Sequence, residues 1–232
     1  MTDTDDVLRD KLDKSWRFFY GRGFIDGFGH ISARTQRPNE ILVTPHDLGR
    51  RSRPEDFVVV DLDGRQIGSD VKLPGELPIH LDVYKARPDV NSVAHFHCLY
   101  PTSFSMSSVA LKPTYFLASI FRDGVPIHPD SRLVLNRDRG AALAETLGAH
   151  RVALMKAHGV VITGDCVEEM TAVAYILEEN AHRTWVTATM GEVEYLSDAA
   201  MAEIEAELLK TKAPFKRIWT LCCHEAAEQE RG

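Results

Sequence analysis

The hydrophobic pattern near the start of the chain has the period of a helix. After the acidic, cap-like stretch TDTDD, apolar residues recur at roughly helical spacing as Val7, Leu8, Leu12, Trp16 and Phe19. This spacing predicts an amphipathic helix over residues 6–20. The glycine-rich stretch GFIDGFGHISART follows, and its pattern predicts a turn that leads into a strand.

Strand and helix patterns alternate in the middle of the chain. Residues 40–45 (EILVTP), 55–67 (EDFVVVDLDGRQI) and 91–97 (NSVAHFH) have the apolar and β-branched character of strands, and the second folds back as a hairpin at its Asp-Gly pair. Between them, residues 77–90 (LPIHLDVYKARPDV) predict a short helix that a proline ends.

Helix patterns dominate the second half. The segment 102–119 is mixed, and we expect a helix followed by a strand. Residues 151–164 predict two strand pieces around a His-Gly step, and residues 166–190 predict a long helix. Further helices are expected over 138–148 and 198–210. Strands that alternate with helices early, followed by helices late, predict an α/β fold with a central mixed or antiparallel sheet.

The amino-acid composition and net charge limit the class of partner that this protein can bind. With 44% apolar and 26% charged residues, the chain has the makeup of a globular protein with a sizeable core. Its formal net charge of -7 argues against nucleic-acid binding, which needs clustered Lys and Arg. The sequence shows no apolar run of the length of a membrane span and no secretory pattern at its start. Its four cysteines include no C-x-x-C pair, so we expect neither a disulfide framework nor a zinc ribbon, and we expect a small-molecule partner and a cytoplasmic location.

Two histidines separated by one residue lie in the predicted strand 91–97. Residues i and i+2 of a strand point to the same face, so His95 and His97 aim both imidazoles at one point, about 6 to 7 Å apart along the backbone. This geometry can chelate a metal ion. The pattern is equally compatible with core histidines whose nitrogens are satisfied by neighbouring groups.

Two further residues favour the metal-site interpretation. His158 interrupts an apolar strand pattern in MKAHGVVITG, where the following glycine permits a turn that presents the imidazole into a cavity. Glu76 follows a Pro-Gly turn and precedes a predicted helix, so its carboxylate is held at the end of an element. Three neutral imidazoles and one carboxylate form a complete shell for a divalent metal ion.

Five separate motifs of this chain resemble, in order and spacing, those of the class II aldolase/adducin family. The motifs are GHISAR (29–34), VTP (43–45), GELPIH (75–80), RPDVNSVAHFH (87–97) and AHGVVITG (157–164), within a match over residues 6–190. The resemblance implies a single-domain α/β/α sandwich with a central mixed, mainly antiparallel sheet. It implies one domain over residues 1–232, with 191–232 as a C-terminal helical tail, and a homotetramer with active sites between subunits.

The resemblance also implies roles for individual residues. In the family, a divalent metal ion is held by the paired histidines, by the histidine of the later His-Gly motif and, in some states, by a glutamate that also acts as general acid/base. Carried over to this chain, the metal ligands are His95, His97, His158 and Glu76, with Glu76 also as the catalytic acid/base. We expect one divalent ion per subunit: histidine ligands suit zinc, and a carboxylate with open positions also suits manganese, iron or cobalt.

The chain departs from the family's sugar-phosphate aldolases at their phosphate site. Those enzymes use a Gly-Asn motif, a threonine and paired serines, whereas this chain has His30 in place of the asparagine and a Pro-Gly pair in place of the serines; only Thr44 is retained. Proline offers neither a hydroxyl nor an N–H group, so a phosphorylated sugar is disfavoured. His30, Arg34 and His46 can instead donate hydrogen bonds to a planar carboxylate of the substrate.

Two other candidate site residues have open alternatives. His80 lies one helical turn after Glu76 and is either a substrate contact or a packed helix residue. Tyr115 lies eleven residues before Pro126, a spacing similar to that of a tyrosine which, in the family's sugar-phosphate aldolases, reaches a neighbouring subunit's site as proton donor. The alternative for Tyr115 is ordinary core or interface packing.

The leading hypothesis is a divalent-metal-dependent carbon–carbon lyase, namely a decarboxylase of a hydroxylated aromatic or pyridine (di)carboxylic acid in aromatic compound catabolism. Decarboxylation and aldol cleavage both break a carbon–carbon bond and leave an electron pair on an enolate-like fragment, which a metal ion stabilises. The first alternative is therefore an aldolase or epimerase that acts on a small hydroxy-carbonyl or sugar-phosphate substrate. The second is a non-enzymatic, adducin-like binding module, a class that lacks the full ligand set.

Overall fold

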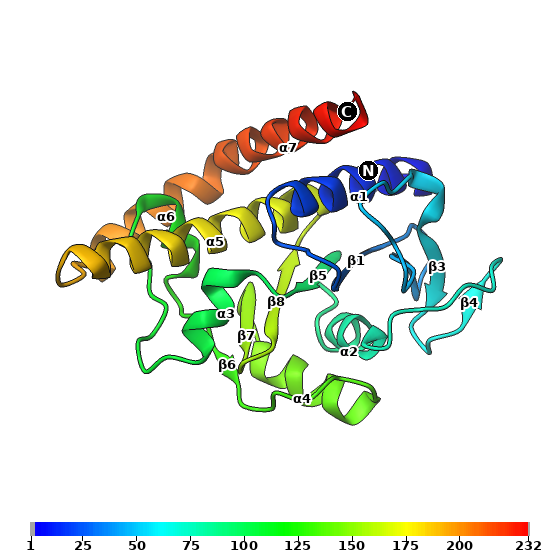
Figure 1. Cartoon of the computed structure of the whole chain (residues 1–232), viewed down its shortest axis with the longest axis horizontal. Helices are drawn as coiled ribbons and strands as arrows, with labels where there is room; N and C mark the ends of the chain where they lie inside the picture. The colour runs from blue at the N-terminus through cyan, green and yellow to red at the C-terminus, as the bar shows by residue number, and fades with distance from the viewer. Residues whose placement is uncertain (1–2, 232) are drawn as a thin grey trace.

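An eight-stranded sheet runs through the centre of the molecule (Figure 1). The computed structural model describes residues 3–231. The strand order is β4-β3-β2-β1-β5-β8-β7-β6, and neighbouring strands are antiparallel except for the parallel pair β6 and β7. The strands are β1 Gly29–Arg34, β2 Glu40–Val43, β3 Val58–Asp61, β4 Gln66–Ile67, β5 Ser92–Phe96, β6 Ile127–His128, β7 Val152–Met155 and β8 Gly159–Gly164. The predicted mixed, mainly antiparallel sheet is confirmed.

Helices cover both faces of this sheet. On one face α2 and α4 pack against each other; on the other lie α1, α3 and α5, and α7 packs across α1 and α5 (Figure 1). The helices are α1 Asp5–Gly21, α2 Leu77–Ala86, α3 Leu99–Ser105, α4 Arg137–Leu147, α5 Val167–Met190, α6 Asp198–Thr211 and α7 Ala213–Arg231, with short 3-10 helices η1 Pro54–Asp56 and η2 Phe116–Phe121. This layering confirms the predicted α/β/α sandwich. Within residues 3–231, no helix combines the length and apolar character that crossing a membrane requires.

Helix starts follow local sequence signals. Thr4 and Asn136 are the N-caps of α1 and α4, and each side chain accepts a hydrogen bond from an amide three residues further on. α2 carries Pro78 in its first turn, where the missing N–H group has no helical partner to lose. Glu76 immediately precedes this turn, so its carboxylate lies at the positive end of the helix dipole.

The segment 102–119 differs from the expected helix followed by a strand. The helix is present as α3, but residues 116–121 form the 3-10 helix η2 instead of a strand. The preceding backbone is bonded to a side chain of α5: Asn180 donates to the Lys112 carbonyl at 3.0 Å and accepts from the Thr114 amide at 2.9 Å. These backbone groups are therefore not available to pair with a neighbouring strand.

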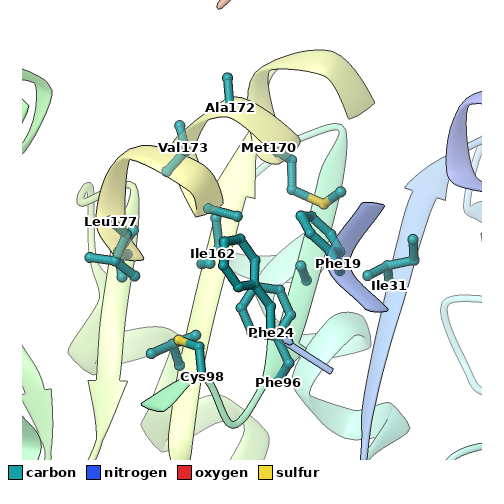
Figure 2. Packing of buried hydrophobic residues seen from close by; sticks show 14 of the residues in the cluster. Phe19, Phe24, Ile31, Phe96, Cys98, Ile162, Met170, Ala172, Val173 and Leu177 are labelled. Atoms are coloured by element: carbon teal, nitrogen blue, oxygen red, sulfur yellow. The ribbon is translucent and has the colours of Figure 1, made fainter. Parts of the chain in front are cut away.

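Successive side chains of β1 and β5 point alternately into two apolar cores on opposite faces of the sheet. Ile31 and Phe96 face α1 and α5, where the Phe96 and Phe19 ring centroids are 5.1 Å apart (Figure 2). The opposite face of the sheet packs against α2 and α4 through a second apolar cluster. Because successive residues of a strand point to opposite faces, His30 and His95 lie on the α2 side.

A carboxyl group is largely buried where α5 passes the start of α3. The Cys98 thiol and the Tyr100 amide beside Glu178 both favour its ionised form. Burial outweighs them and raises the pKa of Glu178 to about 7. The group is therefore partly protonated at neutral pH.

Glu178→Gln is expected to remove a pH dependence of stability. In the wild type the folded chain keeps this proton at pH values where the unfolded chain has released it, so stability falls as pH rises from the ordinary glutamate value of 4.5 to about 7. Chemical denaturation near pH 5 should find the two proteins about equally stable, whereas near pH 8 the variant should be more stable by about 1 to 3 kcal/mol. A stability difference that does not change with pH would contradict this expectation.

Candidate metal centre

Four metal-ligating side chains converge between α2, β5 and the turn that joins β7 to β8. One ligand atom from each of Glu76, His95, His97 and His158 lies within 4.8 Å of the others. Glu76 Oε2 is 3.6 Å from His95 Nε2 and 3.5 Å from His158 Nε2. The structure therefore brings together the four residues that the sequence predicted as metal ligands.

The ends of three elements position these side chains. His95 lies in β5 and His97 directly after it, with ring centroids 5.2 Å apart. His158 lies in the turn between β7 and β8 and follows Ala157, which adopts a left-handed φ of 52°. Ser105 of α3 holds this turn, because its hydroxyl accepts a hydrogen bond from the Ala157 amide at 2.9 Å.

Gly159 allows the turn to approach β5 closely. A Cβ atom at this position would lie 2.6 Å from the Phe96 carbonyl oxygen and 2.7 Å from His97 Cδ2. Both distances are far shorter than van der Waals contact, so a side chain here would displace the end of β5 or the His97 ring. The site therefore requires glycine after His158.

Hydrogen bonds on the outer side of the cluster direct the ligand atoms inward. His95 Nδ1 donates to the Val160 carbonyl at 3.0 Å, so Nε2 carries the lone pair and faces the cluster. Glu76 Oε1 accepts from the Val134 amide at 2.8 Å. Its second oxygen, Oε2, remains for the cluster.

The cluster has the protonation state that a divalent cation needs. Burial lowers the pKa of His95 and of His97, so both imidazoles are neutral near pH 7. Burial alone would raise the pKa of Glu76, but the nearby His158 and His95 rings and the Val134 amide outweigh it and bring the pKa to about 2. Glu76 is therefore an ionised carboxylate.

The inward nitrogens lack partners. Among the residues that the structure describes, His95 Nε2, His97 Nε2 and both ring nitrogens of His158 are buried without a hydrogen bond. Buried polar atoms without partners are rare because they are costly. Three imidazoles and a carboxylate are a donor set that zinc and other divalent transition metals bind, so these residues fit a metal ion.

A pocket of about 490 Å³ opens onto the cluster. Its walls include the apolar side chains of Phe28, Leu48, Leu133 and Leu135. The Phe28 ring stacks on the His97 imidazole with centroids 5.9 Å apart. Apolar walls beside a polar, ionised base suit a flat ligand that carries polar groups at one end.

The segment 133–135 contributes both to the pocket wall and to the position of Glu76. Leu133 and Leu135 line the pocket, and each is about half exposed. Val134 between them is buried, and its amide is the group that holds Glu76. The two wall leucines are therefore joined by peptide bonds to the residue whose amide holds the Glu76 carboxylate.

The predicted substrate contacts divide into those at the pocket and those away from it. His30 and His46 line it, and His46 Nδ1 lies 2.6 Å from an oxygen of Asp47. Thr44 is fully buried, and its hydroxyl accepts from the Ile31 amide at 3.3 Å. The Thr44 hydroxyl is therefore engaged in joining β1 to the residue after β2.

His80 lies behind the pocket wall. It is fully buried, with Nε2 2.6 Å from His30 Nδ1 and Nδ1 2.6 Å from Ser32 Oγ. Both ring nitrogens are engaged by protein groups. This arrangement favours the packed-residue alternative over direct contact with a substrate.

Arg34, which was expected to anchor a substrate carboxylate, is not among the residues that line the pocket. Arg34 lies at the far end of β1, and its guanidinium donates to the carbonyls of Tyr84 at 2.6 Å and Val90 at 2.8 Å. It also covers the Tyr84 ring at 4.6 Å from the centroid. These contacts commit Arg34 to the junction of β1 and α2.

Tyr115 lies in a separate hollow beside α5. The Arg183 guanidinium is 4.9 Å from its ring centroid. Across residues 3–231 its buried hydroxyl has no hydrogen-bond partner. Within one chain Tyr115 is not part of the metal-ligand cluster, so its contact with a neighbouring subunit's site stays a prediction.

Several positioning groups were not predicted. Val134 and Val160 act through backbone atoms, which leave no side-chain signal in a sequence. Phe28 could have been noticed as a large aromatic residue between glycines in GFG, because an apolar ring in a turn is often exposed for binding.

Comparisons with known proteins agree with this architecture. Residues 11–185 match the family described as class II aldolase and adducin N-terminal domain. The chain is 29% identical over 212 residues to a 3,4-dihydroxyphthalate decarboxylase of Arthrobacter keyseri, covering 84% of this chain and 85% of that protein. It is 29% identical over 214 residues to a 3-oxo-tetronate 4-phosphate decarboxylase of Haemophilus influenzae, covering 87% and 98%. An L-fuculose 1-phosphate aldolase structure from Glaciozyma antarctica has a TM-score of 0.85 at 20% identity, covering 98% and 94%, which shows a shared fold.

Removing one imidazole is expected to abolish tight metal binding. His95→Ala and His97→Ala should each weaken zinc affinity by about 100-fold or more, because each removes a ligand from a set that leaves few substitutes. Equilibrium dialysis followed by elemental analysis measures the bound zinc. His224→Ala, which alters an exposed histidine of α7, is the matched control. Unchanged zinc binding in both site variants would show that the ion binds elsewhere.

Proposed function

Because the chain belongs to the class II aldolase and adducin family, we propose that it is a divalent-metal-dependent carbon–carbon lyase that decarboxylates a hydroxylated aromatic or pyridine (di)carboxylic acid. The observation that carries this proposal is the pocket, in which His30 and apolar walls stand beside the four-ligand cluster. A relative named as a decarboxylase of a dihydroxylated aromatic diacid supports the same class of reaction.

The pocket also supports a substrate without a phosphate group. Pro74 and Gly75 form part of its lining and offer no hydroxyl. Thr44 is fully buried and is not among the residues that line the pocket. His30 and His46 are the side chains left to bind an anionic group, and imidazole N–H groups suit a carboxylate.

We assign His95, His97 and His158, with Glu76 as fourth donor, to hold one divalent ion, either zinc or manganese, with iron and cobalt also compatible. Bound there, the ion would supply a Lewis acid that draws electron density from the substrate hydroxyl oxygen.

The chain's own residues account for proton transfer and orientation. Glu76, ionised because its pKa is about 2, accepts the proton of the substrate hydroxyl. The bond to the scissile carboxylate then breaks, carbon dioxide leaves, and the electron pair remains on the ring carbon. Glu76 returns its proton to that carbon. His30 orients the acid by hydrogen bonding to a carboxylate oxygen, and Phe28 covers the ring face and excludes water.

We further propose that residues 1–232 form one domain, with 191–232 as its helical tail, and that four copies assemble with active sites between subunits. Large apolar side chains near Tyr115 are exposed in the single chain, including Phe116 at 55% and Trp185 at 52%, and an interface that covers them would stabilise the assembly. Burial raises the pKa of Tyr115, so it stays protonated and can donate to a neighbouring site. We also propose a cytoplasmic location, because the cysteines are free thiols and a reducing compartment keeps thiols in that state.

An aldolase would use the same ligands, because both reactions leave an electron pair next to a chelated oxygen. An adducin-like binding module would have no need of four convergent ligand atoms. Carbon dioxide release, aldehyde formation or inactivity in both assays therefore distinguishes a decarboxylase, an aldolase and a binding module.

The zinc- or manganese-loaded protein is expected to release carbon dioxide from at least one member of a panel of dihydroxyphthalates, hydroxypyridine dicarboxylates and hydroxybenzoates. Glu76→Gln should lower the rate by about 10² to 10⁴-fold, because it removes the acid/base group. Glu203→Gln, the same exchange on the exposed face of α6, is the matched control.

Absence of carbon dioxide release from a metal-loaded protein would contradict decarboxylation. Aldehyde formation from non-phosphorylated hydroxy-ketones would then identify an aldolase. Inactivity in both assays, with metal bound, would favour a binding module.

A further inference from the structure

A line of four buried polar side chains leads from the pocket wall into the interface between β1 and α2. His30 Nδ1 lies 2.6 Å from His80 Nε2. His80 Nδ1 lies 2.6 Å from Ser32 Oγ, and Ser32 Oγ lies 2.9 Å from the Tyr84 hydroxyl. Of the four, His30 lines the pocket, while His80, Ser32 and Tyr84 are sealed from solvent.

Apolar residues flank the middle of this line, while the Arg34 guanidinium covers the Tyr84 ring at one end and the His95 imidazole stacks on His30 at the other. Ile79, Val93 and Val161 are fully buried in the cluster between the sheet and α2. A polar chain in such surroundings is costly unless every member is bonded, and apolar residues would pack there without that cost. The chain of hydrogen bonds therefore points to a role beyond packing.

Counting hydrogens fixes the direction of the chain. Across residues 3–231, Ser32 Oγ is the side-chain acceptor bonded to the Tyr84 hydroxyl. Tyr84 therefore donates to Ser32, Ser32 donates to His80 Nδ1, and His80 Nε2–H donates to His30 Nδ1. The reverse direction would bury the tyrosine hydrogen without an acceptor, and a Ser32 hydroxyl that accepted from both neighbours would bury its own hydrogen without one, so both arrangements are costlier.

This direction places the His30 proton on Nε2, the ring nitrogen that His80 does not engage. Because His30 Nδ1 and His80 Nε2 lie 2.6 Å apart, only one of these two nitrogens carries a hydrogen, and an imidazole whose Nδ1 accepts must carry its own hydrogen on Nε2. A neutral imidazole without such partners divides its proton between both nitrogens. In this pocket His30 is instead held as a donor.

We propose that His80 is a positioning residue that, through Ser32 and Tyr84, fixes His30 as an N–H donor to a carboxylate oxygen of the substrate. The relay selects ligands that present a hydrogen-bond acceptor to His30 and disfavours those that present a donor there. The identity of the acceptor as a substrate carboxylate rests on the function proposed above, whereas the position of the proton on His30 does not.

The variants His80→Gln and His80→Met form a matched pair. Glutamine and methionine have similar length and shape, but the glutamine amide keeps an N–H group that can donate to His30 Nδ1. Nitrogen NMR of the full-length, zinc-loaded protein with ring-labelled histidine reports the proton position, and His30→Gln identifies the His30 signals. We expect Nε2–H in the wild type and in His80→Gln, and a mixture of both tautomers in His80→Met.

Ligand preference gives a second readout that does not depend on turnover. Calorimetry compares 3,4-dihydroxybenzoate, which carries a carboxylate, with catechol, which lacks it. In His80→Met the preference for 3,4-dihydroxybenzoate over catechol should fall by about 10-fold, because a fixed donor to a charged acceptor is lost. In His80→Gln the preference should stay within about 3-fold of the wild type, and catechol affinity should be unchanged in both.

A second pair of variants tests the direction of the relay. Ser32→Ala removes the donor to His80 Nδ1 and should produce a mixture of His30 tautomers. Tyr84→Phe leaves the Ser32 hydroxyl free to donate to His80, so the Nε2–H form of His30 should persist. Thermal denaturation identifies any variant that fails to fold. If a variant of one pair does not fold, the other pair still tests the relay.

An Nδ1–H tautomer of His30 in the wild type would overturn the relay, as would a folded His80→Met protein that keeps both the tautomer and the carboxylate preference. A wild type with the Nε2–H tautomer but no carbon dioxide release would overturn the proposed reaction and leave the relay standing.

Discussion

The pairing of β1 with β5 is the constraint on which the rest of the site depends. Their antiparallel register sets His30 opposite His95, and the two rings stack with centroids 4.9 Å apart. A shift of β1 by one residue would turn His30 into the aromatic core beside α1 and would bring Ile31 against α2 instead, so His30 and His95 would no longer share a face. The alternation that separates the two apolar cores is therefore the same alternation that assembles the metal ligands.

The other half of the site comes from a single stripe of α2. Glu76, His80 and Tyr84 follow one another at intervals of four residues, so they lie along one face from the start of the helix. Glu76 meets the metal-ligand cluster, and the two later residues meet β1 behind the pocket. One helix face thus supports both the Glu76 carboxylate and the buried hydrogen-bond chain.

Local sequence patterns predicted the sheet, its flanking helices and the four convergent ligands, because these follow from side-chain period and from a short motif around each ligand. They did not predict the surroundings of Arg34, whose guanidinium is bonded to carbonyls that are distant along the chain. The same limit applies to the backbone of Lys112 and Thr114, just before η2, because its hydrogen-bond partner is Asn180 of a distant helix. His80 was identified as a site candidate, but its partner on β1 depends on tertiary packing that no spacing along the chain records.

The segment Leu133 to Leu135 has a consequence for how this protein can change. Its two leucines shape the space that a substrate fills, while the amide between them anchors one oxygen of Glu76. An exchange of either leucine that widens or narrows the pocket also shifts the peptide that aims the carboxylate. Under the proposed function, substrate range and turnover are therefore coupled traits at this loop, and a lineage that accepts a bulkier substrate here must also re-aim the Glu76 carboxylate.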